Sequence, residues 1–346
     1  KDHIVFANYG TILINLGRLQ EAEITTRKAI ELNPDFANAH FNLGNILKDI
    51  GNSNLGGILK DLSKLKEAEL SLRKAIELKP DFASAYSNLG IMLKEFGEVE
   101  EAEISLRKAI ELKPSWETYF FYASCLYKKR KLDASLESLY KAKKMVQTII
   151  PKNIIDVSIK TINVPSNEKT KKQFDKIILY RPVESNLINY LYSLKHIQLN
   201  NLIDSRYGKG FCSEDFELFN DSSPIISKLS IDLKKICMEA LDKKEIISSG
   251  SFFNIFVSGC GAKPHNHISS VDKEFNLSLK KYSLVYYLDI GDQSGKDPGI
   301  LKLYEPEEEV LPANGMIIIF EAKKMHSVSY EGEKDRIVMG FNFYAF

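Results

Sequence analysis

Apolar side chains recur at helical spacing through the first 146 residues, and the same arrangement returns several times along this stretch. Each copy opens with Glu-Leu and has a proline two residues later, where the proline ring cannot continue the hydrogen-bond ladder of a helix. The three clearest copies are ELNPDFANAHFNLG (31–44), ELKPDFASAYSNLG (77–90) and ELKPSWETYFFYAS (111–124). The pattern predicts pairs of antiparallel helices, stacked one after another.

The spacing of the copies is uneven. The second and third copies lie 34 residues apart, whereas the first and second lie 46 apart. The excess of 12 residues has a visible origin, because LGNILKDIGNSN (43–54) is nearly repeated as LGGILKDLSKLK (55–66). We expect this duplication to lengthen the first helix of the second repeat or to add a short helical segment before its second helix. A weaker unit over residues 119–145 is expected to close the stack.

Small residues recur at fixed positions of the repeat, where they let two helices approach closely while Leu, Ile and Phe fill the seam between neighbouring pairs. The positions are Gly10, Gly44 and Gly90; Ala22, Ala68 and Ala102; Ala29, Ala75 and Ala109; and Pro34, Pro80 and Pro114. In period and residue type, residues 5–146 resemble the tetratricopeptide repeat family. The resemblance implies an α-solenoid whose groove binds a protein or peptide partner. A spacer or dimerisation scaffold is the alternative, since a fold alone does not fix a function.

The helical repeat stops near residue 147, and the residues that follow are rich in β-branched side chains, Asn and Pro. We expect residues 147–179 to form a linker that leads into a first strand. Residues 180–195 and 222–244 carry apolar side chains at helical intervals, which predicts two amphipathic helices.

After residue 245 the pattern changes to short apolar or alternating runs separated by Gly, Pro and Asp. Six such runs predict the strands of an antiparallel sandwich or barrel. They are FFNIFVSG (252–259), YSLVYYLDI (282–290), ILKLYEP (300–306), GMIIIFEA (315–322), MHSVSYE (325–331) and RIVMGFNFYAF (336–346). The sequence therefore predicts a multidomain α + β chain, with a helical domain over residues 1–146, a linker and first strand over 147–179, and a β-rich domain over 180–346.

Composition narrows the possible partners. The 47 basic and 46 acidic side chains give a net charge of +1, which argues against a broad basic face for nucleic acid. No run approaches 18 consecutive apolar residues, and no signal-peptide layout opens the sequence, so we expect a cytoplasmic protein with no membrane partner. The four cysteines, Cys125, Cys212, Cys237 and Cys260, are scattered singly, which predicts buried free thiols.

Three of the six histidines lie in two segments of the β-rich domain, KPHNHISSVD (263–272) and KKMHSVSYEGEKDR (323–336). Residues i and i+2 of a strand face the same side, so His265 and His267 can point together, with His326 joining from a later strand. Imidazole nitrogens suit Fe(II), Zn, Mn or Ni. The sequence predicts a metal site here. The alternative is three unrelated histidines held by ordinary hydrogen bonds.

Further residues around these histidines match a known pattern. Pro312 and Gly315 precede the apolar run MIIIF, His326 follows that run after six residues, and Arg336 follows His326 after ten. Residues 180–346 therefore resemble the double-stranded β-helix oxygenases that use Fe(II) and 2-oxoglutarate. The resemblance implies a jelly-roll fold with supporting helices, and it implies that Arg336 pairs with the distal carboxylate of 2-oxoglutarate. A guanidinium fork matches a carboxylate well, although a strand-edge charge beside Asp335 is the alternative.

Two positions depart from the family pattern. The family has Asp or Glu where this chain has His267, so either three histidines bind the metal or Asp272 supplies the carboxylate from the following turn. Val338 stands where the family often has a serine that contacts 2-oxoglutarate. We expect the missing hydrogen bond to come from Asn254, Tyr287 or Asn342.

A second resemblance starts from the same histidines. Gly259, His265, His267 and Asp272 resemble the first metal motif of the cupins, which share the double-stranded β-helix without requiring 2-oxoglutarate. The cupin second motif places its histidine three residues after a glycine, whereas here eleven residues separate Gly315 from His326. That spacing favours the oxygenase.

These observations together predict an iron- and 2-oxoglutarate-dependent dioxygenase that hydroxylates a protein or peptide held by the helical repeats. The alternative is a cupin-like metal-binding protein or a non-catalytic interaction module. Tyr282, Tyr286, Tyr287, Phe252 and Phe253 are candidate cavity walls, and RYGKGF (206–211) is a candidate lid over the site.

Overall fold

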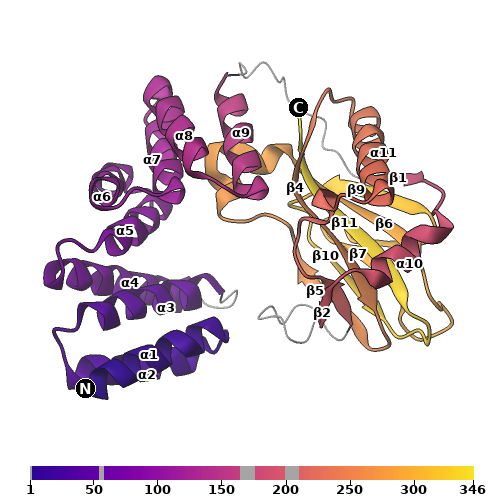
Figure 1. Ribbon diagram of the computed structural model, residues 1–346. Helices are drawn as coiled ribbons and strands as arrows, with labels where there is room; N and C mark the ends of the chain where they lie inside the picture. Colours follow the sequence, from indigo (N-terminus) through magenta and orange to yellow (C-terminus); the bar gives the residue numbers. More distant parts are fainter. Residues whose placement is uncertain (1, 54–57, 164–175, 199–209) are drawn as a thin grey trace. The chain divides into compact units, whose positions relative to one another are not determined.

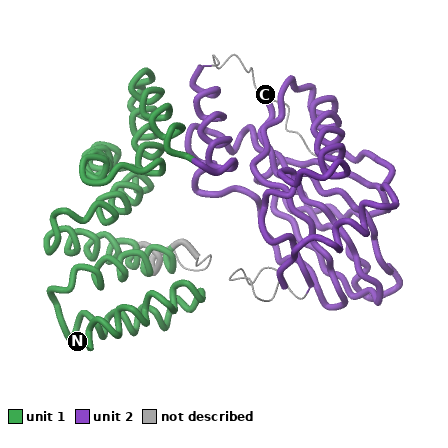
Figure 2. Tube along the Cα trace, viewed as in Figure 1, with its two compact units in different colours: residues 1–146 green, residues 147–346 purple. Residues whose placement is uncertain are grey.

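The computed structural model describes residues 2–53, 58–163, 176–198 and 210–346. The chain divides into two compact units, residues 1–146 and residues 147–346 (Figure 2). In the described residues the first unit is entirely helical, whereas the second combines helices with two β-sheets (Figure 1). No helix among the described residues is long and apolar enough to cross a lipid bilayer.

The first unit is a stack of helix pairs, in which the two helices of a pair contact each other and the second helix of each pair contacts the first helix of the next. The helices are α1 (Asp2–Asn15) with α2 (Leu19–Leu32), α3 (Ala37–Ser53) with α4 (Ile58–Leu78), α5 (Ala83–Glu95) with α6 (Val99–Leu112), and α7 (Trp116–Lys128) with α8 (Leu132–Met145). The repeating sequence therefore forms a helical solenoid, and the weaker fourth copy supplies its last pair.

Close helix packing explains the recurring small residues. A Cβ atom added to Gly90 would lie 2.6 Å from Cγ of Leu106, and one added to Gly44 would lie 2.7 Å from Cγ of Leu72. Ala102, on the facing helix, is fully buried. The first and second helices of a pair thus meet at positions where a larger side chain has no room.

The 12-residue duplication lengthens both helices of the second pair. α3 has 17 residues against 13 in α5, and α4 has 21 against 14 in α6. The lengthening expected for the first helix is present, and the second helix takes up residues as well. Residues 54–57, between the two helices, lie outside the described residues.

The predicted linker proves to be partly helical. Ile149–Asn163 form α9, which contacts strand β4 (Ile246–Phe256) and donates a hydrogen bond from Asn153 to the Ser248 carbonyl (2.8 Å). Pro151 lies in the first turn of α9, where proline is tolerated, so it does not break the helix. Ile155 and Val157 are fully buried. Their tertiary packing outweighs the low helix propensity of β-branched residues, which is why the sequence pattern was misleading.

The second unit contains two antiparallel sheets. In spatial order the seven-stranded sheet consists of β1 (Lys176–Tyr180), β9 (Met316–Glu321), β6 (Lys281–Asp289), β11 (Arg336–Ala345), β4 (Ile246–Phe256), β3 (Phe211–Ser213) and β2 (His196–Gln198). The four-stranded sheet consists of β5 (Cys260–His265), β10 (His326–Tyr330), β7 (Pro298–Leu303) and β8 (Glu308–Val310). Each of the six predicted runs overlaps one of these strands, and β1 is the strand expected at the end of the linker. None of the six runs includes β2, β3, β5 or β8.

Two helices cover one face of the larger sheet, α10 (Ser185–Ser193) and α11 (Pro224–Leu241) (Figure 1). Along β9, Ile317 and Ile319 pack into the cluster with these helices, whereas Ile318 and Phe320 pack toward the smaller sheet. This alternation follows from the two-residue period of a strand. It gives the second unit two separate cores, and the one between the sheets contains the predicted site residues.

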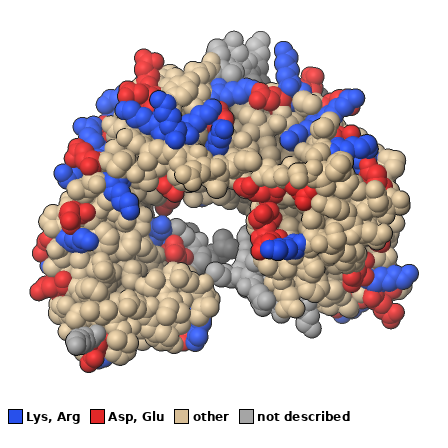
Figure 3. All heavy atoms as spheres, viewed as in Figure 1, with Lys and Arg blue, Asp and Glu red and all other residues tan. Residues whose placement is uncertain are grey.

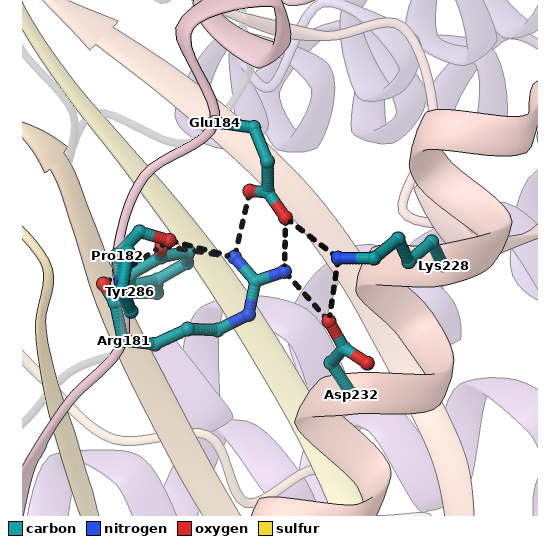
Figure 4. A network of polar contacts seen from close by, with 6 residues as sticks. All are labelled: Arg181, Pro182, Glu184, Lys228, Asp232 and Tyr286. Carbon is teal, nitrogen blue, oxygen red and sulfur yellow. Dashed lines mark hydrogen bonds and ion pairs between the residues drawn. The ribbon is translucent and has the colours of Figure 1, made fainter.

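A network around Arg181 ties the helices to the sheet (Figure 4). Its guanidinium donates to Glu184 at the start of α10 (2.8 Å), to Asp232 of α11 (2.8 Å) and to the Tyr286 hydroxyl on β6 (3.1 Å). Lys228 of α11 donates to the same two carboxylates. One buried cation thus holds three elements together.

Candidate metal centre

Three histidines converge between the sheets. His265 ends β5 and His326 begins β10, and the two are paired directly in the antiparallel ladder. Together with His267, each offers a ring nitrogen within 4.8 Å of the others. The His265 and His326 ring centroids are 4.3 Å apart. This is the spacing of side chains that share one metal ion, and among the described residues it is the only such group of His, Cys, Asp or Glu.

Backbone carbonyls orient two of the imidazole rings. Nδ1 of His265 lies 2.8 Å from the Lys263 carbonyl, and Nδ1 of His326 lies 3.1 Å from the Lys324 carbonyl. A carbonyl only accepts hydrogen bonds, so each Nδ1 carries the proton and the ring lone pair is on Nε2. Burial and the neighbouring His265 lower the pKa of His326 to about 3. His326 is therefore neutral at pH 7, the form that binds metals.

His267 joins the cluster through a loop contact and not through the strand alternation that we expected. β5 ends at His265, so strand alternation does not place His267. Instead its backbone N–H donates to the Ala322 carbonyl (2.9 Å), which attaches the segment after β5 to the residue following β9. The third imidazole is held by the loop and not by a ladder.

Asp272 does not join the histidines. Its carboxylate accepts hydrogen bonds from the Ser269 N–H and hydroxyl (2.7 and 2.6 Å), from Lys281 (2.8 Å) and from the Tyr344 hydroxyl (2.6 Å). It is only 1% exposed. The expectation that Asp272 supplies a metal ligand is therefore wrong, because both oxygens are engaged in a buried structural network. That network instead fixes the loop that follows His267.

Arg336 is a buried cation with unused donors. It is fully buried at the start of β11, and its Nε and Nη2 have no hydrogen-bond partner among the residues that the structure describes. Nη1 donates to the Pro298 carbonyl (3.3 Å), and the guanidinium lies 5.3 Å from the ring centroids of Tyr287 and Tyr330. Burial lowers its pKa from the ordinary arginine value, yet an arginine retains its charge in proteins. The expectation of a strand-edge charge beside Asp335 does not fit this placement.

The backbone leaves room for this guanidinium at Gly299. A Cβ atom there would lie 1.1 Å from Nη1 of Arg336, and the residue has a φ of +79°. Both the contact and the backbone conformation require glycine. Gly299 and Tyr330 are site residues that the sequence analysis missed. The Pro-Gly pair at the start of β7 was the only signal, and it reads equally as an ordinary turn.

The metal cluster and Arg336 open into one cavity. Its lining includes all the other predicted site residues except Asp272, namely His265, His267, His326, Asn254, Tyr287 and Asn342. Val338 lines it as well and offers only a methyl surface. Asn342 accepts a hydrogen bond from Ser283 (2.7 Å). The rest of the wall is largely apolar, from residues such as Phe256, Ala262 and Leu301.

The aromatic residues expected as cavity walls divide between the two faces of the sheet. Phe252 and Tyr287 line the cavity. Phe253, Tyr282 and Tyr286 lie in the other core, beneath the helices. The segment expected as a lid, residues 206–211, lies outside the described residues except for Gly210 and Phe211. The four cysteines are buried and none of them forms a disulfide within the part of the chain that the structure describes, in agreement with the sequence.

The side chains present suit a divalent metal together with an organic anion. Three imidazoles form a neutral nitrogen set for a borderline metal such as Fe(II) or Zn. Two orphaned donors of Arg336 in the same cavity suit a carboxylate, because a buried donor without a partner costs free energy that an anionic ligand would recover. The cavity thus combines the two features that a metal-chelated carboxylic acid requires.

Comparison with known proteins bears on the first unit. A family profile described as "TPR repeat" matches residues 10–51, and one described as "Tetratricopeptide repeat" matches residues 52–82 and 83–115. No curated protein matches the chain.

Solved structures similar to the chain include a thermophilic TPR protein of Thermus thermophilus, with 19% identity, 47% of this chain and 81% of that chain covered, and a TM-score of 0.40. MamA of Desulfovibrio magneticus has 22% identity, with 42% of this chain and 75% of that chain covered, and a TM-score of 0.36. An O-GlcNAc transferase mutant of Thermobaculum terrenum has 22% identity, with 41% of this chain and 26% of that chain covered, and a TM-score of 0.36. From the profile matches, residues 10–115 of this chain are tetratricopeptide repeats, which support a protein–protein interaction module.

Proposed function

We propose that residues 147–346 form an Fe(II)- and 2-oxoglutarate-dependent dioxygenase that hydroxylates a protein or peptide. The observation that carries the proposal is the buried, under-partnered Arg336 in the same cavity as the three converging histidines. A metal site alone needs no such cation. An arginine in an apolar wall, with two donors that have no partner among the described residues, favours a cavity that receives an anion.

The three histidines would hold the metal through their Nε2 atoms. Their second ring nitrogens remain available to anchor the rings, as the carbonyl contacts of His265 and His326 illustrate. Bound Fe(II) with 2-oxoglutarate would supply the oxidising chemistry for C–H hydroxylation. Because all three ligands are neutral, the protein contributes no negative charge to the metal, and the dianionic cosubstrate would balance it.

Arg336 would bind the distal carboxylate of 2-oxoglutarate. Nε and Nη2 lie on one edge of a guanidinium and can donate side by side to both oxygens of a carboxylate. Asn254 and Asn342 line the same cavity and offer amide groups in place of the serine that Val338 replaces. Tyr287 and Phe256 would exclude water and so strengthen the ion pair.

The architecture of the second unit is consistent with a double-stranded β-helix. Two antiparallel sheets face each other, with the histidines on the smaller sheet and its connecting loop and Arg336 on the larger.

The repeats suggest the class of substrate. Tetratricopeptide repeats support binding of a protein, and a substrate tethered by one unit meets the other at a raised effective concentration. A polypeptide is therefore the substrate class we propose.

One observation favours a second candidate, a cupin-like metal protein without oxygenase activity. Among the described residues no carboxylate joins the three histidines, and an all-histidine set also serves Zn and other metals. This candidate leaves the orphaned donors of Arg336 without a role.

Anaerobic titration of the Fe(II)-loaded protein with 2-oxoglutarate tests the proposal. We expect the weak visible charge-transfer band of an iron-bound 2-oxo acid in the wild type. Arg336→Gln should weaken 2-oxoglutarate binding while leaving iron affinity unchanged, and His326→Ala should lose iron. Iron binding without the band would contradict the proposal and favour the cupin-like candidate.

A further inference from the structure

Three large aliphatic side chains are exposed at one repeated position of the first unit. Ile24 on α2, Leu70 on α4 and Ile104 on α6 are 70%, 62% and 66% exposed. They occupy the same place in the motifs EAEIT, EAELS and EAEIS. Scattered exposed apolar residues are ordinary, but these three recur in register on the second helices of successive repeats. We call these three residues the aliphatic stripe.

Charged side chains of opposite sign flank the stripe. On the N-terminal side of each helix, three residues before the stripe, stand Glu21, Glu67 and Glu101. On the C-terminal side, three residues after it, stand Arg27, Arg73 and Arg107, and each is followed directly by a lysine. Residues three apart are neighbours on a helix surface, so an acidic row and a basic row border the apolar one. All six of these side chains are at least partly exposed.

Each of the six charged side chains already has an ion-pair partner within its own chain. Arg27 contacts Glu67 (2.6 Å) and Arg73 contacts Glu101 (2.7 Å), which links one repeat to the next, while Glu21 contacts Arg18 (2.5 Å) and Arg107 contacts Glu103 (2.7 Å). All of these pairs except Arg107 with Glu103 are solvent-exposed on both sides, and such pairs contribute little, so they can exchange partners at small cost. Figure 3 shows Lys and Arg beside Asp and Glu over the first unit. A groove lined by Ile30, Glu67 and Leu70 lies beside the centre of the stripe and can receive a side chain of the partner.

The order of the acidic, aliphatic and basic rows determines which partner surface is complementary to the stripe. When two copies face each other, their twofold axis lies in the plane of contact. An axis along the stripe places the acidic row of one copy opposite the basic row of the other, and each aliphatic residue meets its own counterpart. An axis across the stripe places acid against acid and base against base. The surface is therefore self-complementary in one arrangement only.

We propose that the aliphatic stripe binds a second copy of this chain, with the twofold axis along the stripe. The apolar row contributes the buried surface, and the charged rows set the register and exclude the crossed arrangement. The surface lies on the second helices of the repeats, so it is independent of the site between the sheets. The proposal does not depend on the proposed function.

Sedimentation of the full chain over a concentration series is the first test. We expect a monomer–dimer equilibrium whose dissociation constant rises at least about tenfold in Leu70→Glu, because a charge would be buried at the centre of the contact. Ile231→Glu, an equally exposed aliphatic residue on α11, is the matched control and should leave the equilibrium unchanged. A wild type that stays monomeric, or an unaffected Leu70→Glu variant, would overturn the proposal.

Cysteine cross-linking tests the arrangement. Ile24→Cys alone should form a disulfide-linked dimer under mild oxidation, since Ile24 faces its own counterpart. The four natural cysteines are buried, so they should not compete. Cross-linking only between Ile24→Cys and Ile104→Cys chains would indicate the crossed arrangement and contradict the proposed axis.

Charge reversal provides an independent test. A chain with Glu21, Glu67 and Glu101 changed to Lys, and another with Arg27, Arg73 and Arg107 changed to Glu, should each be monomeric. Mixed together they should form a heterodimer, because each then presents the charges that the other lacks. Dimers of either chain alone would show that the charged rows play no part.

Discussion

A charged pair of the repeats and two charged residues of the β-rich unit lie in contrasting environments. In the repeats, Arg73 and Glu69 form a partly exposed pair (38% and 20%). In the β-rich unit, Asp272 and Arg336 are buried; four donors surround Asp272, whereas two donors of Arg336 have no partner among the described residues. A surface pair adjusts easily, whereas a buried charge must be satisfied by the fold or by a ligand. This difference distinguishes the repeats, which we expect to bind a partner, from the second unit, which contains the candidate reaction site.

The largest effect is expected from breaking a buried charge network. Asp272→Asn should lower the free energy of unfolding by about 3–5 kcal/mol, because Lys281 would remain buried without its counter-charge. Glu69→Gln, at a surface pair of the repeats, should cost less than about 1 kcal/mol. Chemical denaturation measures the free energy of unfolding of both variants. Equal losses of stability would contradict the proposed difference between the buried and the surface pair.

Gly299→Ala should come next. The added methyl group would displace the Arg336 guanidinium and strain a positive φ, so we expect a loss of about 2–4 kcal/mol together with loss of 2-oxoglutarate binding. Gly259 is the control, since it has a positive φ of +75° and nothing within 4 Å of an added Cβ. Calorimetric titration with 2-oxoglutarate and thermal melting should distinguish Gly299→Ala from the control variant Gly259→Ala. Retained binding in Gly299→Ala would count against the role given to Arg336.

Glycine contacts in the repeats should give a smaller effect. Gly90→Ala places a methyl group against the buried Leu106, and we expect a net loss of about 1–3 kcal/mol despite the better helix propensity of alanine. Gly10→Ala meets only the hydroxyl end of Thr26 and should cost less. Unfolding in urea can rank the two variants by their free energy of unfolding. A more stable Gly90→Ala variant would mean that the helix pairs can separate to make room.

The smallest effect is a pH dependence at Glu184. The hydrogen bond from Arg181 lowers the pKa of Glu184 to about 2, below its ordinary value of 4.5. The stabilisation is therefore complete above about pH 4.5 and is lost as the pH falls toward 2. Because solvent reaches this side chain, we expect about 1 kcal/mol between wild type and Glu184→Gln at pH 7. Unfolding free energies at several pH values should show this difference shrinking in acid; a constant difference would contradict the linkage.

The sequence was informative where a residue acts through its neighbours in the chain. The helix pairs, the glycine contacts and six of the strands in the β-rich unit follow from periodicity. It was less informative for α9, where buried Ile155 and Val157 outweigh propensity, and for Asp272, whose four donors come partly from Lys281 and Tyr344. Those partners are distant in the sequence, so no local pattern could reveal that the carboxylate was already engaged.

By itself the sequence determined the repeat array and indicated which histidines and which arginine to examine. Period and residue type suffice for a solenoid, because each repeat contacts only its neighbours. The tertiary structure decided which of those side chains meet. It placed three histidines within 4.8 Å of one another, excluded Asp272, and buried Arg336 beside Gly299 with two donors unsatisfied. The physical reason is that these contacts join residues that are distant in the sequence. Strand pairing places His265 beside His326, a loop contact with Ala322 places His267, and Arg336 comes to the same cavity from the other sheet.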